Sequence, residues 1–223
     1  RQYLFNKNSL DNILELIQKL KINLLIIDFQ LSPIQQRNLE LFFKVKVIDR
    51  TQVILEIFSS RAISNEGKIQ VELAALNFQK TRLVRSWTHL ERQRGGSGFL
   101  GGPGERQIEL DRRIINKNIK NLNANLQKVV KTRSIQNSKR KNSSSIIVSL
   151  VGYTNTGKST LFNNLTNSSV ISKNMLFATL DPTLRLMKHE MSYKKKIILS
   201  DTVGFISSLP TELVESFKST LEF

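Results

Sequence analysis

The feature that most constrains the fold of this chain is an apolar run that leads directly into a glycine-bounded loop. Residues 146–152 read IIVSLVG, and residues 152–159 read GYTNTGKS, which fits the pattern G-x-x-x-x-G-K-[ST]. The residues that follow, LFNNL, favour a helix. In such a strand–loop–helix unit, backbone N–H groups and the positive end of the helix surround a phosphate group. The sequence therefore predicts an α/β domain that holds a nucleoside triphosphate.

A second motif, DTVGF at 201–205, follows another apolar run, KKIILSD, which predicts a strand ending in an acid. We expect Lys158 to reach the β- and γ-phosphates, the Ser159 hydroxyl to bind Mg²⁺, and Asp201 to hold the ion through a water molecule. Gly204 can offer its N–H to the γ-phosphate and move away when that group leaves. The two motifs together predict a nucleotide-dependent switch.

Between these motifs lies FATLDPT at 177–183, in which Thr179 is the candidate second magnesium ligand. By itself it would be an ordinary loop threonine, and its position between the two motifs is what favours the metal. Lys158, Thr179 and Gly204 are the catalytic candidates, and Ser159 and Thr179 the metal ligands. The predicted nucleotide-binding residues are Gly152, Tyr153, Thr154, Asn155, Thr156, Gly157, Lys158, Ser159, Thr160, Phe177, Ala178, Thr179, Leu180, Asp181, Asp201, Thr202, Val203 and Gly204.

The first part of the chain, residues 1–62, alternates between helix and strand patterns and predicts a partial α/β domain. The expected elements are a helix over 10–21 capped by Ser9, a strand over 23–29, a helix from Pro33 to about Phe43, a strand over 45–49 and a helix from Thr51 to about Ala62. Ser32 followed by Pro33 is a typical helix start.

Residues 63–132 predict two long helices that pair antiparallel as a hairpin. On each helix, mostly apolar residues recur at alternating intervals of four and three, which is the spacing of a coiled-coil seam. Two ordinary amphipathic helices on a larger body would show the same spacing. The seam positions are Ile69, Leu73, Leu76, Lys80 and Leu83 on the first helix, and Ile115, Ile119, Leu122, Leu126 and Val129 on the second. The expected tip is 94–105, followed by a linker at 133–145 and the N-terminal half of the nucleotide-binding domain at 146–223.

The charge of the chain suggests an anionic partner. Its 34 Lys and Arg against 18 Asp and Glu give +16, and the segment 112–145 holds ten basic residues and no acid. A solvated helix face is the alternative. Six of ten glycines lie in the tip, where exposed backbone could approach folded RNA closely, unless the tip is only a flexible linker. The RNA-contact candidates are Arg94, Gly95, Gly96, Gly98, Gly101, Gly102, Gly104, Arg106, Arg112 and Arg113.

WTHLERQRGGSGFLGGPGERQIELDRR at 87–113, followed by GYTNTGKSTLFNNL, FATLDPTLR and DTVGFISSLP, resembles the HflX family of ribosome-associated GTPases. The resemblance implies GTP as substrate with Mg²⁺, and a large ribosomal subunit as partner, with the hairpin tip reaching toward the peptidyl-transferase region. It also implies a role in splitting or recycling ribosomes, and a cytoplasmic, ribosome-associated, monomeric protein, or one in an organelle stroma if it is plastid-encoded. Asn155 stands where related GTPases place an Asn that helps to hold K⁺.

Two departures limit this reading. Phe205 occupies the place where other GTPases carry a Gln that orients the attacking water, so hydrolysis is expected to be slow without the ribosome. The Asn-Lys-x-Asp motif that reads guanine would lie beyond Phe223, so the fragment alone is expected to be inactive. An RNA-binding module whose nucleotide site does not turn over, and an ATP-dependent factor of the same architecture, therefore remain alternatives. The sequence contains no run of about 18 uncharged apolar residues, so it predicts no membrane-spanning helix.

Overall fold

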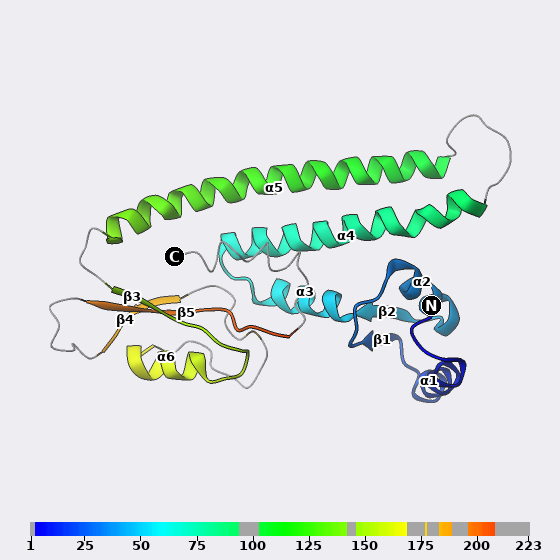
Figure 1. Cartoon of the computed structure of the whole chain (residues 1–223), viewed down its shortest axis with the longest axis horizontal. Helices are drawn as coiled ribbons and strands as arrows, with labels where there is room; N and C mark the ends of the chain where they lie inside the picture. The colour runs from blue at the N-terminus through cyan, green and yellow to red at the C-terminus, as the bar shows by residue number, and fades with distance from the viewer. Residues whose placement is uncertain are drawn as a thin grey trace. The chain divides into compact units, whose positions relative to one another are not determined.

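A computed structural model describes residues 3–93, 103–141, 146–168, 177, 183–188 and 196–207 (Figure 1). The chain divides into two compact units: residues 1–56 with 76–117, and residues 57–75 with 118–223. The mixed α/β class is the class that the sequence predicts; along the chain, the long helices follow the first small sheet and precede the second. In the part of the chain that the structure describes, no helix is both long and apolar enough to cross a membrane.

The first unit is built on a small parallel sheet. Its elements are α1 (Lys7–Leu20), β1 (Leu24–Ile27), α2 (Pro33–Phe43) and β2 (Lys46–Asp49). The two strands pair in parallel from Leu24 opposite Lys46 to Ile27 opposite Asp49. Each strand is followed or preceded by a helix, as the alternating pattern of the sequence requires.

The helix starts in this unit follow local hydrogen bonding. The α1 helix begins earlier than predicted, because Asn6 and not Ser9 is its cap: the Asn6 side chain accepts a hydrogen bond from the backbone N–H of Ser9 at 2.9 Å. At α2 the prediction is confirmed. Ser32 accepts from the backbone N–H of Gln35 at 3.2 Å, and the Gln35 side chain accepts from the N–H of Ser32 at 2.9 Å. This reciprocal pair is a capping box.

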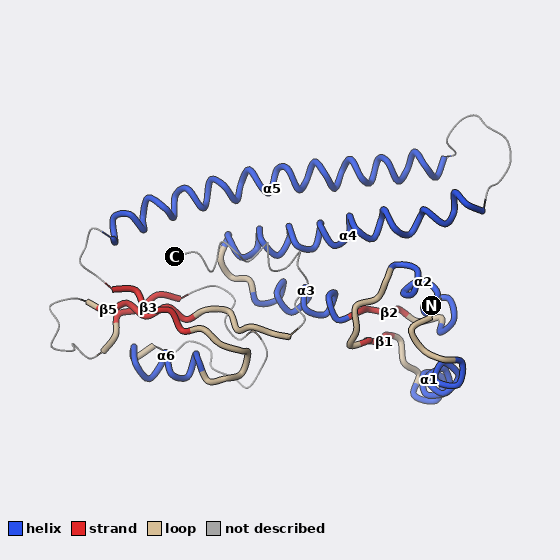
Figure 2. The backbone as a smooth tube through the Cα atoms, viewed as in Figure 1, coloured by secondary structure: helices blue, strands red, loops and turns tan. Residues whose placement is uncertain are grey.

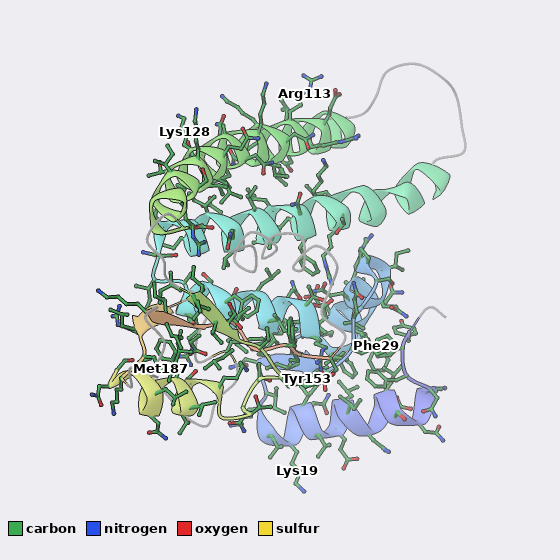
Figure 3. The ribbon with its side chains drawn as sticks, turned by 60° about the vertical axis from the view of Figure 1, so that its left-hand side comes forward. Lys19, Phe29, Arg113, Lys128, Tyr153 and Met187 are labelled. Carbon is green, nitrogen blue, oxygen red and sulfur yellow. The ribbon has the colours of Figure 1, made fainter. Side chains whose placement is uncertain are left out.

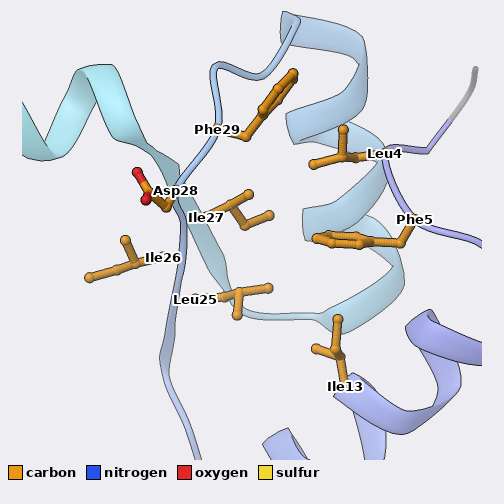
Figure 4. A pocket seen from close by; sticks show the side chains of 8 residues that line it. All are labelled: Leu4, Phe5, Ile13, Leu25, Ile26, Ile27, Asp28 and Phe29. Atoms are coloured by element: carbon orange, nitrogen blue, oxygen red, sulfur yellow. The ribbon is translucent and has the colours of Figure 1, made fainter. Parts of the chain in front are cut away.

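An apolar core joins the helices to the sheet of the first unit. Its buried members are Leu10, Ile17, Ile27, Leu31, Leu39, Phe43 and Val47. Beside this core lies a cavity of about 360 Å³ (Figure 4), lined by Leu4, Phe5, Ile13, Leu25, Ile26, Ile27, Asp28 and Phe29. Seven of these eight side chains are apolar, so the cavity does not have the polar groups that a phosphate site needs.

An ion pair between a buried acid and a partly buried arginine ties α4 (Asn65–Gln93) to the end of β2. Asp49 is fully buried, pairs with Arg82, and accepts from the backbone N–H groups of Gln52 at 2.9 Å and Leu31 at 3.3 Å. The Arg82 guanidinium also lies 4.3 Å from the centroid of the Phe78 ring. Burial lowers the pKa of Arg82, and the nearby Asp49 charge opposes that shift. These partners make Asp49 part of the architecture.

The connections differ from the prediction at both ends of the second long helix. The chain passes from β2 into α3 (Arg50–Arg61) and α4, and α5 runs over Pro103–Lys141. Residues 103–105, expected in the tip, form its first turn, since proline is favoured at the first helical position. The expected linker 133–145 is helical through Lys141, because residues 133–141 contain neither Gly nor Pro to end the helix.

The predicted seam appears in the exposure of α5. Between residues 109 and 135 all five predicted seam residues are among the half-buried positions, and every other position except two is exposed. The half-buried positions are Asp111, Ile115, Ile119, Leu122, Leu126, Val129 and Arg133. Ile69 and Leu73 of α4 are buried. Arg133 of α5 pairs with Glu66 in the first turn of α4 at 3.2 Å, which is the contact an antiparallel arrangement requires.

The second unit contains a three-stranded sheet in the order β3–β5–β4. Figure 2 shows β3 and β5 of this sheet in red. The β3 strand (Ile146–Leu150) pairs in parallel with β5 (Ile197–Asp201), and β4 (Thr183–Leu186) pairs antiparallel with β5. The helix α6 (Lys158–Thr166) covers one face of this sheet, and Phe162 of α6 is fully buried. The carboxyl ends of β3 and β5 therefore lie side by side, where nucleotides bind in parallel sheets.

Candidate nucleotide-binding site

The loop between β3 and α6 has the backbone of a phosphate-binding loop. Asn155 has φ 61° and Gly157 has φ 83°, both in the left-handed region. An added Cβ at Gly157 would meet nothing within 4 Å, so the backbone conformation, not space, calls for glycine there. Gly157 caps α6 without a side-chain hydrogen bond. The first N–H groups of α6 can therefore bind an anion.

Two side chains of this loop donate to one carbonyl. Lys158 Nζ lies 2.5 Å from the Tyr153 carbonyl oxygen, and the Thr156 hydroxyl lies 2.8 Å from the same atom. Partial burial lowers the pKa of Lys158, and the charge of Asp201 opposes this shift. The lysine thus lies folded back along the loop, so its ammonium group remains beside the backbone that would surround a phosphate.

A hydroxyl and a carboxylate meet where the two parallel strands end. The Ser159 hydroxyl donates to Asp201 Oδ2 at 2.7 Å, and Asp201 is fully buried at the end of β5. The Thr202 hydroxyl donates to the Leu150 carbonyl at 2.7 Å, which ties the chain after β5 to the end of β3. Mg²⁺ binds oxygen ligands, usually one or two carboxylates together with substrate phosphates. The oxygen atoms of Ser159 and Asp201 fit that ion.

The described residues contain no cluster of three or more His, Cys, Asp or Glu side chains that could hold a metal by themselves.

The segment after Asp201 runs along the phosphate loop. Phe205 N–H donates to the Gly152 carbonyl at 3.0 Å, and Thr154 N–H donates to the Phe205 carbonyl at 2.8 Å. A Cβ built on Gly204 would lie 2.7 Å from Thr154 Cα and 2.8 Å from its N. Glycine is required here because the two backbones touch. The Phe205 side chain is 42% exposed and carries no hydrogen-bonding group.

Most predicted nucleotide-binding residues lie around this loop. The structure places Gly152 to Thr160 in the loop and the first turn of α6, and Asp201 to Gly204 at the end of β5 and just after it. Tyr153, labelled in Figure 3, is 65% exposed. The remaining candidates, Ala178, Thr179, Leu180 and Asp181, lie outside the described residues.

Phe177 is placed by a contact that the sequence does not predict. Its ring is 2% exposed and meets the buried Phe58 ring of α3 edge-on, with 4.5 Å between ring centroids and 77° between ring planes. Phe177 itself has φ 53°. No spacing rule links positions 119 residues apart, so only the fold reveals this pair.

Of the RNA-contact candidates, Arg94, Gly95, Gly96, Gly98, Gly101 and Gly102 lie outside the described residues. Gly104 and Arg106 lie in the first turn of α5, and Arg112 and Arg113 are exposed farther along it.

The exposed face of α5 carries a row of cations, which we call the basic stripe: Arg113, Lys117, Lys120, Lys128 and Lys131. All five are exposed, and Figure 3 labels Arg113 and Lys128 among them. On a helix of 3.6 residues per turn these positions lie opposite the seam and extend over about 27 Å. Arg113 pairs with Glu109, while residues 112–135 contain no acid. The stripe is therefore a largely uncompensated positive surface.

Three family models match successive parts of the chain. Their descriptions are "GTP-binding GTPase N-terminal" for residues 1–59, "GTP-binding GTPase Middle Region" for residues 61–140 and "50S ribosome-binding GTPase" for residues 147–222. The family assignments thus cover nearly the whole chain.

Curated relatives named GTPase HflX are similar over the same length. The protein of Magnetococcus marinus is 52% identical over 218 residues, which are 98% of this chain and 50% of the relative. The protein of Escherichia coli is 48% identical over 221 residues, 99% of this chain and 51% of the relative. The chain thus spans about half the length of these relatives.

Among solved structures, a GTP-binding protein from the archaeon Sulfolobus solfataricus in complex with GDP aligns with 99% of this chain and 54% of its own, at 28% identity and a TM-score of 0.48.

Proposed function

This chain belongs to the HflX family of GTPases, and we propose that it is the part of a GTP-hydrolysing factor that binds the triphosphate and engages the large ribosomal subunit. The observation that carries the nucleotide half is the Ser159–Asp201 contact at 2.7 Å beside the phosphate loop. It joins the hydroxyl that would bind Mg²⁺ to the carboxylate that would orient the ion's water shell. GTP, not ATP, follows from the family.

In this proposal the chain's own residues bind and orient the nucleotide. The backbone of 152–159 surrounds the phosphates, Lys158 exchanges the Tyr153 carbonyl for phosphate oxygens, and Gly204 presents its N–H to the γ-phosphate. When bound there, Mg²⁺ would supply positive charge that stabilises the transferring phosphoryl group. Thr179 is proposed as its second protein ligand, and Asn155 as a ligand of a K⁺ beside the phosphates.

Hydrolysis is proposed to be slow until the ribosome is bound. The Phe205 side chain cannot hydrogen-bond a water molecule, so another group must order the nucleophile. Phosphate release by the full-length protein, measured with and without large subunits, tests this. We expect stimulation by the subunits. An unstimulated rate would favour the second candidate, an RNA-binding module whose nucleotide site does not turn over, which the same phenylalanine supports.

The basic stripe is proposed as a contact surface for ribosomal RNA. Its five cations lie on one exposed face, with the exposed amides of Asn116, Asn121 and Asn125 beside them. Cations bind phosphates, and amides can bind phosphates and 2′-hydroxyls. No aromatic side chain lies between residues 109 and 135, so this face offers no aromatic ring for a base to stack on and the RNA backbone is the expected contact.

Salt dependence tests the stripe. Changing Lys117, Lys120, Lys128 and Lys131 to Gln should reduce the slope of log affinity for large subunits against log salt by about 3, since each phosphate contact contributes about 0.7–0.9. A matched control removes the same charge from the exposed Lys7, Lys19, Lys21 and Lys46. Equal salt slopes in both variants would mean that the stripe is only a solvated helix face.

We further propose a monomer that acts in the cytoplasm with ribosomes. The relatives named above are bacterial proteins and give no support for an organelle location. Full-length protein should elute at monomer mass in light scattering.

A further inference from the structure

The backbone of Phe205 is bonded to the phosphate loop through both of its polar groups. Its N–H donates to the Gly152 carbonyl at 3.0 Å, and its carbonyl accepts from the Thr154 N–H at 2.8 Å. These two bonds make Phe205 the parallel bridge partner of Tyr153. Because paired hydrogen bonds of this kind fix the register of two chains, the loop determines where the segment after Asp201 lies.

Gly204, one residue earlier, lies directly against Thr154 of this loop. A Cβ built on Gly204 would lie 2.7 Å from Thr154 Cα, 2.8 Å from Thr154 N and 2.8 Å from Thr154 Cγ2. Both residues are half-buried. The backbone and the methyl group of Thr154 therefore fill the space beside Gly204, and the attraction between these packed atoms opposes movement of Gly204 away from the loop.

The methyl group is the part of this contact that depends on the type of residue at position 154. Almost any residue there would supply a Cα and an N–H, whereas a serine in the place of Thr154 would lack Cγ2. A β-branched side chain is also stiff at χ1, so its methyl group presents a fixed surface to Gly204. The position of Gly204 matters because its N–H is the proposed donor to the γ-phosphate.

We propose that Thr154 is a positioning residue of the nucleotide site, whose methyl group holds Gly204 beside the phosphate loop before GTP binds. The inference rests on the proposed GTP chemistry. A donor that is already in place loses less conformational freedom on binding than one that must first be ordered. GDP has no γ-phosphate to accept from Gly204, so loss of the methyl group weakens GTP binding and leaves GDP binding nearly unchanged.

The test compares three single variants of the full-length protein: Thr154→Ser, Thr154→Val and, as a matched control, Thr166→Ser. Serine at position 154 removes the methyl group and keeps the hydroxyl, whereas valine keeps the methyl group and removes the hydroxyl. Thr166 is half-buried in the last turn of α6, and its hydroxyl donates to the Phe162 carbonyl at 2.7 Å. The control thus removes one methyl group from the same unit and keeps the hydroxyl.

Affinities for GTP and GDP are measured with Mg²⁺ present. We expect the GTP-to-GDP affinity ratio to fall about fourfold in Thr154→Ser, the effect of burying one methyl group less. Thr154→Val should restore the wild-type ratio, even if its affinity for both nucleotides is lower. Thr166→Ser should keep the wild-type ratio. An unchanged or higher ratio in Thr154→Ser, or an equal fall in Thr154→Val, would overturn the inference.

Hydrogen exchange of the Phe205 amide in the nucleotide-free protein provides a second readout. This amide is bonded to the Gly152 carbonyl, so it reports how often the segment leaves the loop. Exchange should be about fourfold faster in Thr154→Ser and as slow as in wild type in the other two variants. Exchange in Thr154→Ser at the wild-type rate would also overturn the inference. Wild-type protein that binds neither nucleotide would instead refute the proposed function.

Discussion

Two buried aspartates occupy the same place in two sheets, yet their surroundings differ. Asp49 ends β2 and Asp201 ends β5, both at the carboxyl end of a strand with a parallel neighbour, and both are fully buried. Asp49 faces the Arg82 guanidinium and two backbone N–H groups. Asp201 faces the hydroxyl of Ser159, beside a phosphate loop.

The different partners of the two aspartates distinguish a structural carboxylate from one that can bind a ligand. A buried carboxylate paired with a partly buried guanidinium cannot turn to a metal without leaving that cation unpaired, which is costly. A carboxylate that accepts from a hydroxyl loses little when a cation with its water shell takes the place of that bond. The partners of a buried acid, more than its place in the fold, thus indicate whether it binds a ligand.

The largest expected effect is the contrast between the two Asp→Asn variants. Asp49→Asn leaves the partly buried Arg82 without its countercharge and should cost about 3 kcal/mol of the free energy of unfolding, the lower end for a buried pair, measured by urea denaturation. Asp201→Asn should instead lower Mg²⁺ affinity in the GTP complex about 10–100-fold, as loss of an outer-shell partner does. If Asp201→Asn were the more destabilising variant and bound Mg²⁺ normally, the contrast would be wrong.

A double-mutant cycle sharpens the structural half. Arg82→Met alone should destabilise by about 3–5 kcal/mol, because it leaves the Asp49 charge buried and unpaired. The double variant Asp49→Asn/Arg82→Met should lose clearly less than the sum of the single losses, since neither charge then remains. Urea denaturation of all four proteins measures the coupling. Strict additivity would mean that the two side chains do not act as a pair.

On the functional half, Gly204→Ala should distort the site at a cost of about 1–3 kcal/mol in GTP binding, because the new Cβ overlaps the Thr154 backbone. Adding Thr154→Gly removes only the Thr154 side chain, and the Cα and N contacts at 2.7 and 2.8 Å remain. The double variant should therefore not recover. GTP affinity is measured by titration. If the double variant regained it, the steric overlap would be with the Thr154 side chain and not with its backbone.

The smallest effect is a pH dependence. Burial lowers the pKa of Lys158 below its usual 10.5. In the proposed site the protonated amine binds the triphosphate, so GTP affinity should fall as pH rises through this lowered pKa, at a lower pH than for an ordinary lysine. Lys158→Arg stays charged throughout and should lose the alkaline decline even if its affinity is lower. Titrations between pH 7 and 10 measure both. A decline that persists in the arginine variant would assign it to another group.

Local patterns predicted what depends on neighbours in sequence. The strand–loop–helix around Gly157, the α2 capping box and the seam from Ile115 to Val129 follow from spacings that secondary structure converts directly into geometry. The Ser159–Asp201 contact was within reach because both residues were expected to serve the same Mg²⁺.

Long-range partners were not predictable in the same way. Nothing in the residues around Asp49 or Phe58 indicates that Arg82 and Phe177 would lie against them, since these pairs are 33 and 119 residues apart. The length of α5 was underestimated for a different reason. A run rich in Ser, Asn and Lys suggests a linker, but without Gly or Pro it can continue a helix that has already formed.

The affinity of the full-length protein for GTP with Mg²⁺, measured in wild type and in Lys158→Ala, tests the central claim most directly. Lys158 lies in the phosphate loop, next to the serine that contacts Asp201. Removal of its ammonium group should abolish measurable triphosphate binding while the melting temperature without nucleotide stays close to wild type. Retained GTP affinity in a folded Lys158→Ala protein would contradict the assignment of this loop as the phosphate site.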